Sequence, residues 1–330
     1  GTEIMCERKE LLSIQDLSVH YITKDMGTCK AVNNVSFNIY EGETIGLVGE
    51  TGAGKTTIAL SILGLIPSPP GKIVDGKIVY KGEDLLKKNN KAMQKIRGKE
   101  ISMIFQDPMT TLNPIDTVGD QIAEVIGLHN HVSKKEAIEQ AGKMLEMVGI
   151  PKERYGEYPH QFSGGMKQRV VIAMALACSP ALLLADEPTT ALDVTIQAQI
   201  LEMMNDIKKT HDGAIMLITH DLGVVAQMCD RVAIVYAGEI LEIGTVQQVY
   251  KNILHPYTKG LFESLPGYSA GKRLKQIDGL MPDPSDLPPL CKFEPRCPYS
   301  CEQCKKEMPQ LIDVGDGHMV RCLRVQKGQV

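Results

Sequence analysis

A glycine-rich stretch near the start of the chain has the residue types and spacing of an anion-binding loop. The sequence GETGAGKT, residues 49–56, fits the pattern G-x-x-x-x-G-K-[ST] and stands between an apolar run and a helix-like run. Its glycines let the backbone wrap a phosphate, and successive N–H groups then point at the anion. Lys55 would reach the β- and γ-phosphates, and the Thr56 hydroxyl would bind Mg²⁺. The residues that we expect to line this nucleotide site are Gly49, Glu50, Thr51, Gly52, Ala53, Gly54, Lys55, Thr56 and Thr57.

A pair of carboxylates follows another apolar run. In LLLADEP, residues 182–188, Asp186 and Glu187 stand at the end of a predicted buried strand. An Asp at this position suits the second magnesium ligand of phosphate-loop enzymes, and Glu187 is the candidate that polarises the attacking water. Alone, the pair would more simply be the charged start of a helix, but the upstream loop favours catalysis. The chain contains no N-K-x-D sequence, which argues against a guanine nucleotide.

A cluster of cysteines marks the C-terminal part of the chain, which has nine cysteines in all. Cys291, Cys297, Cys301 and Cys304 are followed by Cys322. The N-terminus lacks an apolar export segment, so we expect a reducing compartment, where clustered thiols favour a metal over disulfides. Four thiolates suit zinc or an iron–sulfur cluster, and free thiols are the third alternative. The segment is poor in core-forming residues, so a bound metal would supply folding free energy.

The hydrophobic pattern predicts the elements that would position these residues. Alternating residues from Leu11 to Tyr40 predict strands, and Asp75-Gly76 predicts a turn between two short strands. Helical spacing dominates residues 117–148, where Ser133 can cap a helix that Gly149 ends. Strand–helix alternation elsewhere predicts an α/β fold with a parallel-sheet core, a helical insertion and a small cysteine-rich extension. We expect a nucleotide-binding domain over residues 1–250, with its helical subdomain at about 108–165, and the extension over 251–330.

Composition and charge exclude other classes. The chain has 330 residues and a formal net charge of −4, which gives no support for a nucleic-acid partner. The longest apolar run, residues 170–185, is interrupted by Ser179-Pro180 and does not predict a membrane span. Any membrane partner is therefore expected to be a separate subunit.

The stretch FSGGMKQR, residues 162–169, lies between the two phosphate-related motifs and resembles the signature motif of ABC ATPases. Other positions agree with this family. Gln106 in MIFQDP resembles its Q-loop, residues 191–193 (ALD) its D-loop, and His220 in LITHD its switch histidine. Tyr21 resembles the aromatic residue that stacks on adenine in this family.

The resemblance implies a P-loop NTPase fold, with a RecA-like parallel-sheet core and an antiparallel β subdomain, and makes residues 1–250 the ABC ATPase domain. It also implies that two such ATPases sandwich two ATP molecules. Ser163, Gly164 and Gly165 would bind the γ-phosphate held by the partner's loop. Gln106 would link the magnesium and water region to the helical insertion, which would press on a membrane subunit, and His220 would contact the γ-phosphate. The implied catalytic residues are Glu187, His220 and Gln106, and the implied Mg²⁺ ligands are Thr56, Gln106 and Asp186.

Two further stretches indicate the branch of the family. DEPTTALDVTIQAQIL, residues 186–201, and HPYTKGLFESLP, residues 255–266, resemble the ATPases of dipeptide and oligopeptide importers, although nickel importers share much of this pattern. C-terminal tails of this branch hold a [4Fe-4S] cluster through four cysteines. The matching ligands here are Cys291, Cys297, Cys304 and Cys322, with zinc as the rival; Cys301 is an extra thiol that forms a C-x-x-C with Cys304.

The resemblance thus implies an ATP-hydrolysing, energy-coupling subunit of a peptide importer, peripheral at the cytoplasmic face of the cell membrane. Its expected partners are a second ATPase subunit, related or identical, two membrane permease subunits and an extracytoplasmic peptide-binding protein. Two rivals are a nickel importer ATPase and a soluble ABC ATPase that acts on DNA or the ribosome. A further interpretation, compatible with transport, makes the cysteine segment an iron or redox sensor that gates the ATPase.

Overall fold

The computed structural model describes residues 9–23, 27–190, 192–210, 212–265 and 276–328. Their contacts divide the chain into two compact units. The first unit is built mainly from residues 87–218, and the second from residues 10–39, 44–86 and the chain from Thr219 onward. Of the sequence motifs above, Ala191 of the ALD stretch and Pro266 of the HPYT stretch lie outside the described residues.

The second unit contains a four-stranded sheet of order β2-β1-β4-β5. Its strands are β1 (Glu10–Thr23), β2 (Gly27–Tyr40), β4 (Gly71–Tyr80) and β5 (Glu83–Asp84). β1 runs antiparallel to β4, as expected for the antiparallel subdomain. The turn predicted at Asp75-Gly76 is wrong, because both residues lie within the single strand β4, where the register against β1 shifts. Gly76 has a φ of +105°, a conformation open to glycine, so the pair forms an irregularity in the strand rather than a hairpin.

The same unit carries a second group of strands. β3 (Thr44–Val48) is buried throughout and pairs in parallel with β9 (Arg231–Tyr236), which pairs antiparallel with β10 (Glu239–Thr245). The C-terminal segment extends this group, because β12 (Met319–Val320) pairs with β10 and β11 (Ile312–Asp313) pairs with β12. The helices of this unit are α1 (Lys55–Leu63), α8 (Leu222–Met228), α9 (Val246–Lys251), α10 (Pro256–Glu263), α11 (Leu323–Gln326) and the short 3₁₀ helix η4 (Glu294–Arg296); η1 (Leu85–Lys87) leads out of it.

Buried polar groups join the C-terminal segment to the rest of the second unit. Glu242 of β10 is fully buried and accepts hydrogen bonds from the backbone N–H groups of Leu254 and His255. His318 Nε2 lies 2.9 Å from Glu242 Oε1. A buried carboxylate needs such partners, so Glu242 ties the start of α10 to His318, which lies 76 residues from Glu242 in the sequence.

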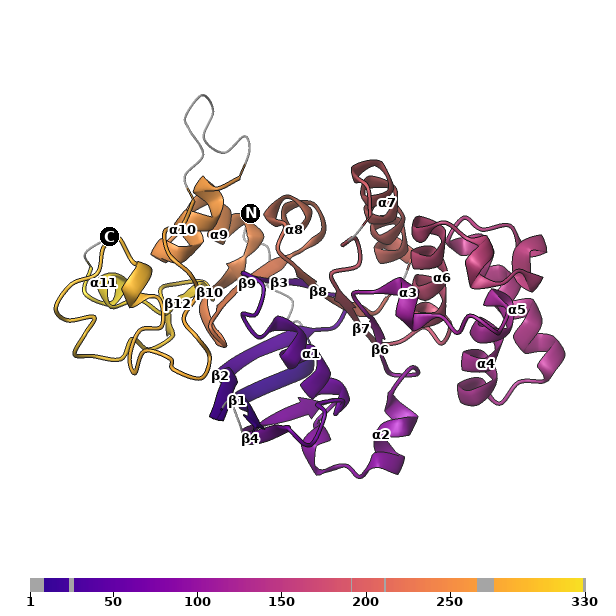
Figure 1. Ribbon diagram of the computed structural model, residues 1–330, viewed down its shortest axis with the longest axis horizontal. Coiled ribbons are helices and arrows are strands. Elements are labelled where there is room, and N and C mark those ends of the chain that lie inside the picture. Colours follow the sequence, from indigo (N-terminus) through magenta and orange to yellow (C-terminus); the bar gives the residue numbers. More distant parts are fainter. Residues whose placement is uncertain (1–8, 24–26, 191, 211, 266–275, 329–330) are drawn as a thin grey trace. The chain divides into compact units, whose positions relative to one another are not determined.

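The first unit combines three parallel strands with a layer of helices. β6 (Ile101–Ile104), β7 (Leu182–Asp186) and β8 (Ala214–Thr219) pair in parallel, with β7 in the middle. The helices α4, α5 and α6 lie side by side, as Figure 1 shows. The helices of this unit are α2 (Asn90–Ile96), α3 (Pro108–Thr111), α4 (Val118–Asn130), α5 (Lys134–Met147), α6 (Gly164–Leu176), α7 (Val194–Thr210), and the 3₁₀ helices η2 (Lys152–Gly156) and η3 (Pro159–Gln161).

Helix α5 has the ends that the sequence predicts. Ser133 and Glu136 form a reciprocal capping box at its start, and Gly149 follows its end with a φ of +76°. Ala141 and Leu145 are buried, whereas Ile138 is 39% exposed. The α/β fold class with a helical insertion is confirmed. Among the described residues, no helix is both long and apolar enough to cross a bilayer.

Candidate nucleotide-binding and hydrolysis site

The glycine-rich loop occupies the turn between β3 and α1, in the second unit. Its glycines are required by close packing as well as by backbone conformation. A Cβ on Gly49 would lie 2.1 Å from the carbonyl oxygen of Val235, and one on Gly54 would lie 2.4 Å from that of Ala31. Gly54 also has a φ of +99° and is the N-cap residue of α1. The loop thus presents backbone N–H groups at a helix N-terminus, the arrangement that binds phosphates.

The side chain of Lys55 lies inside this loop. It is buried, and its ammonium group donates hydrogen bonds to the carbonyl oxygens of Gly49, at 2.8 Å, and of Glu50, at 3.0 Å. Thr56, the predicted magnesium ligand, is exposed. The cation is therefore held inside the curve of the loop, where phosphate oxygens would be bound.

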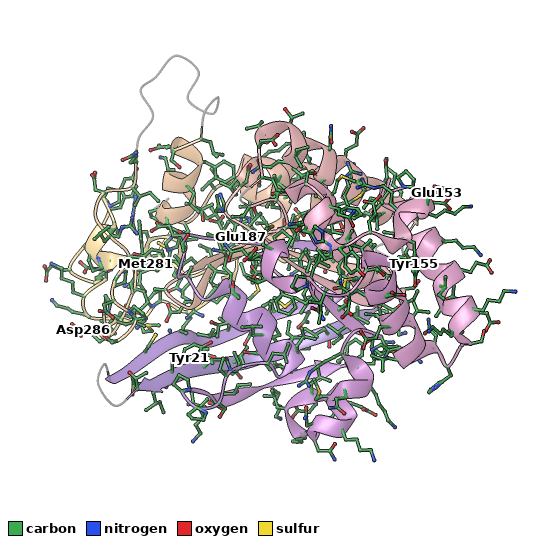
Figure 2. The ribbon with its side chains drawn as sticks, turned by 45° about the vertical axis from the view of Figure 1, so that its right-hand side comes forward. Tyr21, Glu153, Tyr155, Glu187, Met281 and Asp286 are labelled. Atoms are coloured by element: carbon green, nitrogen blue, oxygen red, sulfur yellow. The ribbon has the colours of Figure 1, made fainter. Side chains whose placement is uncertain are left out.

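Two other predicted nucleotide contacts belong to the same unit. Tyr21 lies on β1 (Figure 2), and its hydroxyl is 3.4 Å from the Thr57 hydroxyl, so the structure brings this ring to the helix that follows the loop. His220 is exposed directly after β8. The next residue, Asp221, caps α8 by accepting from the Gly223 N–H at 2.7 Å, which fixes the chain beside the histidine.

The predicted water-polarising residue lies in the first unit, where β7 ends. Asp186 is buried as the last residue of that strand, and Glu187 (Figure 2) follows with a φ of +45°. A positive φ in a residue with a side chain is strained and is common at functional sites. Gln106 Nε2 donates to Glu187 Oε2 at 3.1 Å, and the Thr190 hydroxyl donates to the same oxygen at 2.8 Å.

The structure therefore brings Gln106 and Glu187 together, although they are far apart in sequence. Thr190 is a member of this group that sequence reasoning missed. The sequence feature that could have identified Thr190 is the stretch EPTT, in which it follows Glu187 by three residues.

The signature stretch begins helix α6. Ser163 is its N-cap, and the side chain accepts from the Met166 N–H at 3.4 Å. Ser163 and Gly164 are exposed, whereas Gly165 is buried, and a Cβ there would lie 2.4 Å from the Ile196 side chain. The stretch thus offers a helix N-terminus at the surface, while Gly165 lets α6 approach α7.

The C-terminal cysteines converge in the second unit. Cys291, Cys297, Cys304 and Cys322 line one small cavity, together with Phe293 and Tyr299. Cys301 is not among the lining residues, and its sulfur lies 3.5 Å from that of Cys304. Burial raises the pKa of the Cys291 thiol to about 12 and that of Cys297 to about 11. Within the described part of the chain, no three Cys, His, Asp or Glu side chains stand close enough together to hold a metal ion.

Comparisons with known proteins agree with these motifs. Residues 32–190 match the family model described as ABC transporter, and residues 241–304 match the C-terminal region of oligopeptide/dipeptide transporters. The dipeptide transport ATP-binding protein DppD of Bacillus subtilis (strain 168) is 51% identical over 95% of this chain and 94% of its own length. The oligopeptide transport ATP-binding protein AppD of the same organism is 48% identical over 94% of this chain and 96% of its own length.

The fold also matches solved structures. The dimeric ATP-binding cassette MJ0796, bound to ADP and phosphate in a post-hydrolysis state, superimposes with a TM-score of 0.64 at 26% identity, over 72% of this chain and 99% of that one. The cbiO1 protein of Clostridium perfringens, part of an ABC transporter complex, gives a TM-score of 0.63 at 25% identity, over 74% and 92%. From its motifs, its fold and relatives that span nearly its whole length, the chain belongs to the ABC transporter ATP-binding proteins, in the dipeptide and oligopeptide transport family.

Proposed function

We propose that this chain binds MgATP at the loop of residues 49–57 and hydrolyses it to drive peptide import through separate permease subunits. The proposal rests on the loop itself. The Lys55 ammonium group is buried inside the loop and donates hydrogen bonds to two of its carbonyl oxygens, so it lies where phosphate oxygens would bind. Tyr21, beside Thr57, would stack on the adenine ring.

The hydrolytic residues have separate tasks. Thr56, Gln106 and Asp186 offer hydroxyl, amide and carboxylate oxygens, which are the donors that Mg²⁺ prefers. Bound there, Mg²⁺ would offset the negative charge of the phosphates. Glu187 would accept a proton from the attacking water, and the hydrogen bonds from Gln106 and Thr190 orient its carboxylate. His220 would contact the γ-phosphate and hold the water in place.

A second ATPase chain would complete each site. Ser163 and Gly164 lie exposed at the N-terminus of a helix of 13 residues, where the helix dipole favours an anion. We therefore infer that they bind the γ-phosphate on a partner's loop. The partner is an identical or a related ATPase.

The helical layer of the first unit is suited to contact a membrane subunit. Met109 and Ile115 follow Gln106 and are 60% and 78% exposed. Nearby, the exposed Ile138 lines a hollow with Asp120 and Tyr155, whose hydroxyl donates to the Asp120 carboxylate at 2.9 Å (Figure 2 labels Tyr155). Exposed apolar residues rimmed by polar groups are typical of interaction sites. Docking there would hold the chain at the cytoplasmic face of the membrane and would link Gln106 to the permease.

Transport with reconstituted partners tests this function. Assembled with two permease subunits and a peptide-binding protein in vesicles, the chain is expected to drive ATP-dependent uptake of a labelled peptide. Ser163→Arg should abolish uptake and ATP-induced dimerisation, because the larger cationic side chain fills the position of the partner's γ-phosphate. ATP-dependent uptake of nickel without peptide would instead identify the nickel importer. Recovery of the chain with ribosomes or DNA, and not with permease, would contradict transport.

We further propose that Cys291, Cys297, Cys304 and Cys322 hold a [4Fe-4S] cluster. The four thiols surround one cavity, and four cysteines are the ligand set that such a cluster requires. Zinc, which four thiolates can also hold in a tetrahedron, is the rival occupant. A bound cluster would stabilise the folded form of this segment, which has few core-forming residues of its own.

Metal analysis separates these alternatives. Purified without oxygen, the chain is expected to be brown and to hold about four irons. Cys291→Ser should lose iron and colour, whereas Cys301→Ser, the matched control outside the cavity, should keep both. Zinc in the colourless protein would make the segment a structural zinc site. Equal iron loss in both variants would contradict the ligand assignment.

A further inference from the structure

Glu50, the second residue of the phosphate-binding loop, has all three of its polar groups engaged. Its carbonyl oxygen accepts from Lys55 at 3.0 Å, and its backbone N–H donates to the Tyr257 hydroxyl at 3.1 Å. Its two carboxylate oxygens each lie 3.1 Å from Nη1 of Arg296. Two of these three partners, Tyr257 and Arg296, come from the chain beyond residue 250.

Arg296 is held rigidly in its position. Its side chain is only 7% exposed, compared with 30% for Glu50. Besides Glu50, its Nε donates to the carbonyl oxygen of Asp278 at 2.9 Å, and Nη1 lies 3.3 Å from the Tyr236 hydroxyl. A guanidinium group fixed by several hydrogen bonds loses little entropy when it binds a carboxylate. The ion pair is thus a stable part of the loop's surroundings.

The ion pair also has an electrostatic consequence. Glu50 brings a negative charge into a loop that must accept a triphosphate, and in a partly buried setting like charges repel strongly. Arg296 offsets that charge and restrains the side chain. Met281 also lies beside the loop, since a Cβ placed on Gly52 would be 3.2 Å from its terminal methyl group (Met281 is labelled in Figure 2).

We propose that Arg296 is a positioning residue of the nucleotide site, which neutralises and orients Glu50 so that the loop accepts the phosphates of ATP. Arg296 ends the short helix η4, and the next residue, Cys297, lines the cysteine cavity. The same short helix therefore positions a side chain at the loop and one at the cavity. The inference rests on the proposed function of residues 49–57 as the phosphate-binding loop. It assigns to the C-terminal segment a direct part in ATP affinity.

The test measures MgATP affinity and steady-state hydrolysis of the full chain. Arg296→Met is expected to raise the Kd and KM for MgATP about tenfold, since it leaves a partly buried carboxylate unpaired, while kcat changes little. Arg296→Lys, which keeps the charge, should recover part of the affinity. Adding Glu50→Gln to Arg296→Met should restore affinity to within about threefold of the original chain, because it removes the repelling charge. A purely structural role for Arg296 would instead lower the melting temperature measured without nucleotide and leave the Kd of the folded protein unchanged.

Arg324→Met is the matched control. Arg324 belongs to the same segment and lies 4.5 Å from the centre of the Tyr299 ring. This variant is expected to leave ATP affinity unchanged. If it weakens binding as much as Arg296→Met does, or if Glu50→Gln fails to rescue, the direct role of Arg296 is overturned. Should Arg296→Met fail to fold, Arg296→Lys with and without Glu50→Gln gives the same comparison.

Lys55→Ala distinguishes this inference from the proposed function. If Lys55→Ala abolishes ATP binding while Arg296→Met and Arg296→Lys bind normally, the loop assignment stands and the role of Arg296 is wrong. If Lys55→Ala binds ATP normally, the loop assignment fails, and the inference fails with it.

Discussion

Replacing Glu187 with glutamine is expected to lower the rate of ATP hydrolysis by about 10²–10⁴-fold while leaving ATP binding intact. The amide keeps the shape of the carboxylate but cannot take a proton from water. Its oxygen can still accept from Gln106 and Thr190, the two donors that bond Glu187 Oε2 at 3.1 and 2.8 Å. The local structure should therefore persist, and the loss should lie in kcat rather than in KM.

The measurement is phosphate release at saturating MgATP, with nucleotide affinity measured in parallel. Glu153→Gln is a suitable control, because Glu153 is an exposed carboxylate in the same unit (Figure 2). A rate above about one tenth of the original would contradict the assigned role, given the size expected for a positioned base.

Replacing Lys55 with alanine is expected to weaken MgATP binding by about a hundredfold or more. The change removes a buried cation from the loop, and hydrogen bonds to charged groups contribute about 1.5–3 kcal/mol each. Loss of two or more such bonds to phosphate oxygens corresponds to at least about two orders of magnitude in Kd. The carbonyl groups of Gly49 and Glu50, which now accept from the ammonium group, would also lose their donor.

Titration with a fluorescent ATP analogue gives the affinity, and the melting temperature without nucleotide shows whether the variant is folded. Lys77→Ala, an exposed lysine on β4 in the same unit, controls for the loss of one positive charge. Unchanged affinity in a folded Lys55→Ala protein would argue against the loop as the phosphate site.

Local sequence patterns were sufficient for much of the fold. The strand–loop–helix unit around residues 49–56 and the ends of α5 follow from glycine positions, capping residues and hydrophobic spacing, which act over a few residues. The same local rules failed at Asp75-Gly76, where pairing with β1 kept the two residues inside one strand. Tertiary pairing there outweighed a favourable turn sequence.

The contacts that complete the site could not be predicted from local sequence patterns. Arg296 and Glu50 are 246 residues apart, and no spacing rule connects them. Likewise, spacing alone does not separate the paired thiols Cys301 and Cys304, and it was the resemblance to the family that named Cys304. The structure places Cys304, and not Cys301, among the residues that line the cavity.

The pairing of the late strand β12 with β10, and of Arg296 with Glu50, has a consequence for biosynthesis. Ribosomes add about 5–20 residues per second, so about 10–50 s separate the synthesis of Glu50 from that of its ionic partner. During that interval the nascent chain carries the complete motif GETGAGKT without the side chain that offsets its carboxylate. ATP binding would therefore be about tenfold weaker until the segment around Arg296 has been made and has folded against the loop.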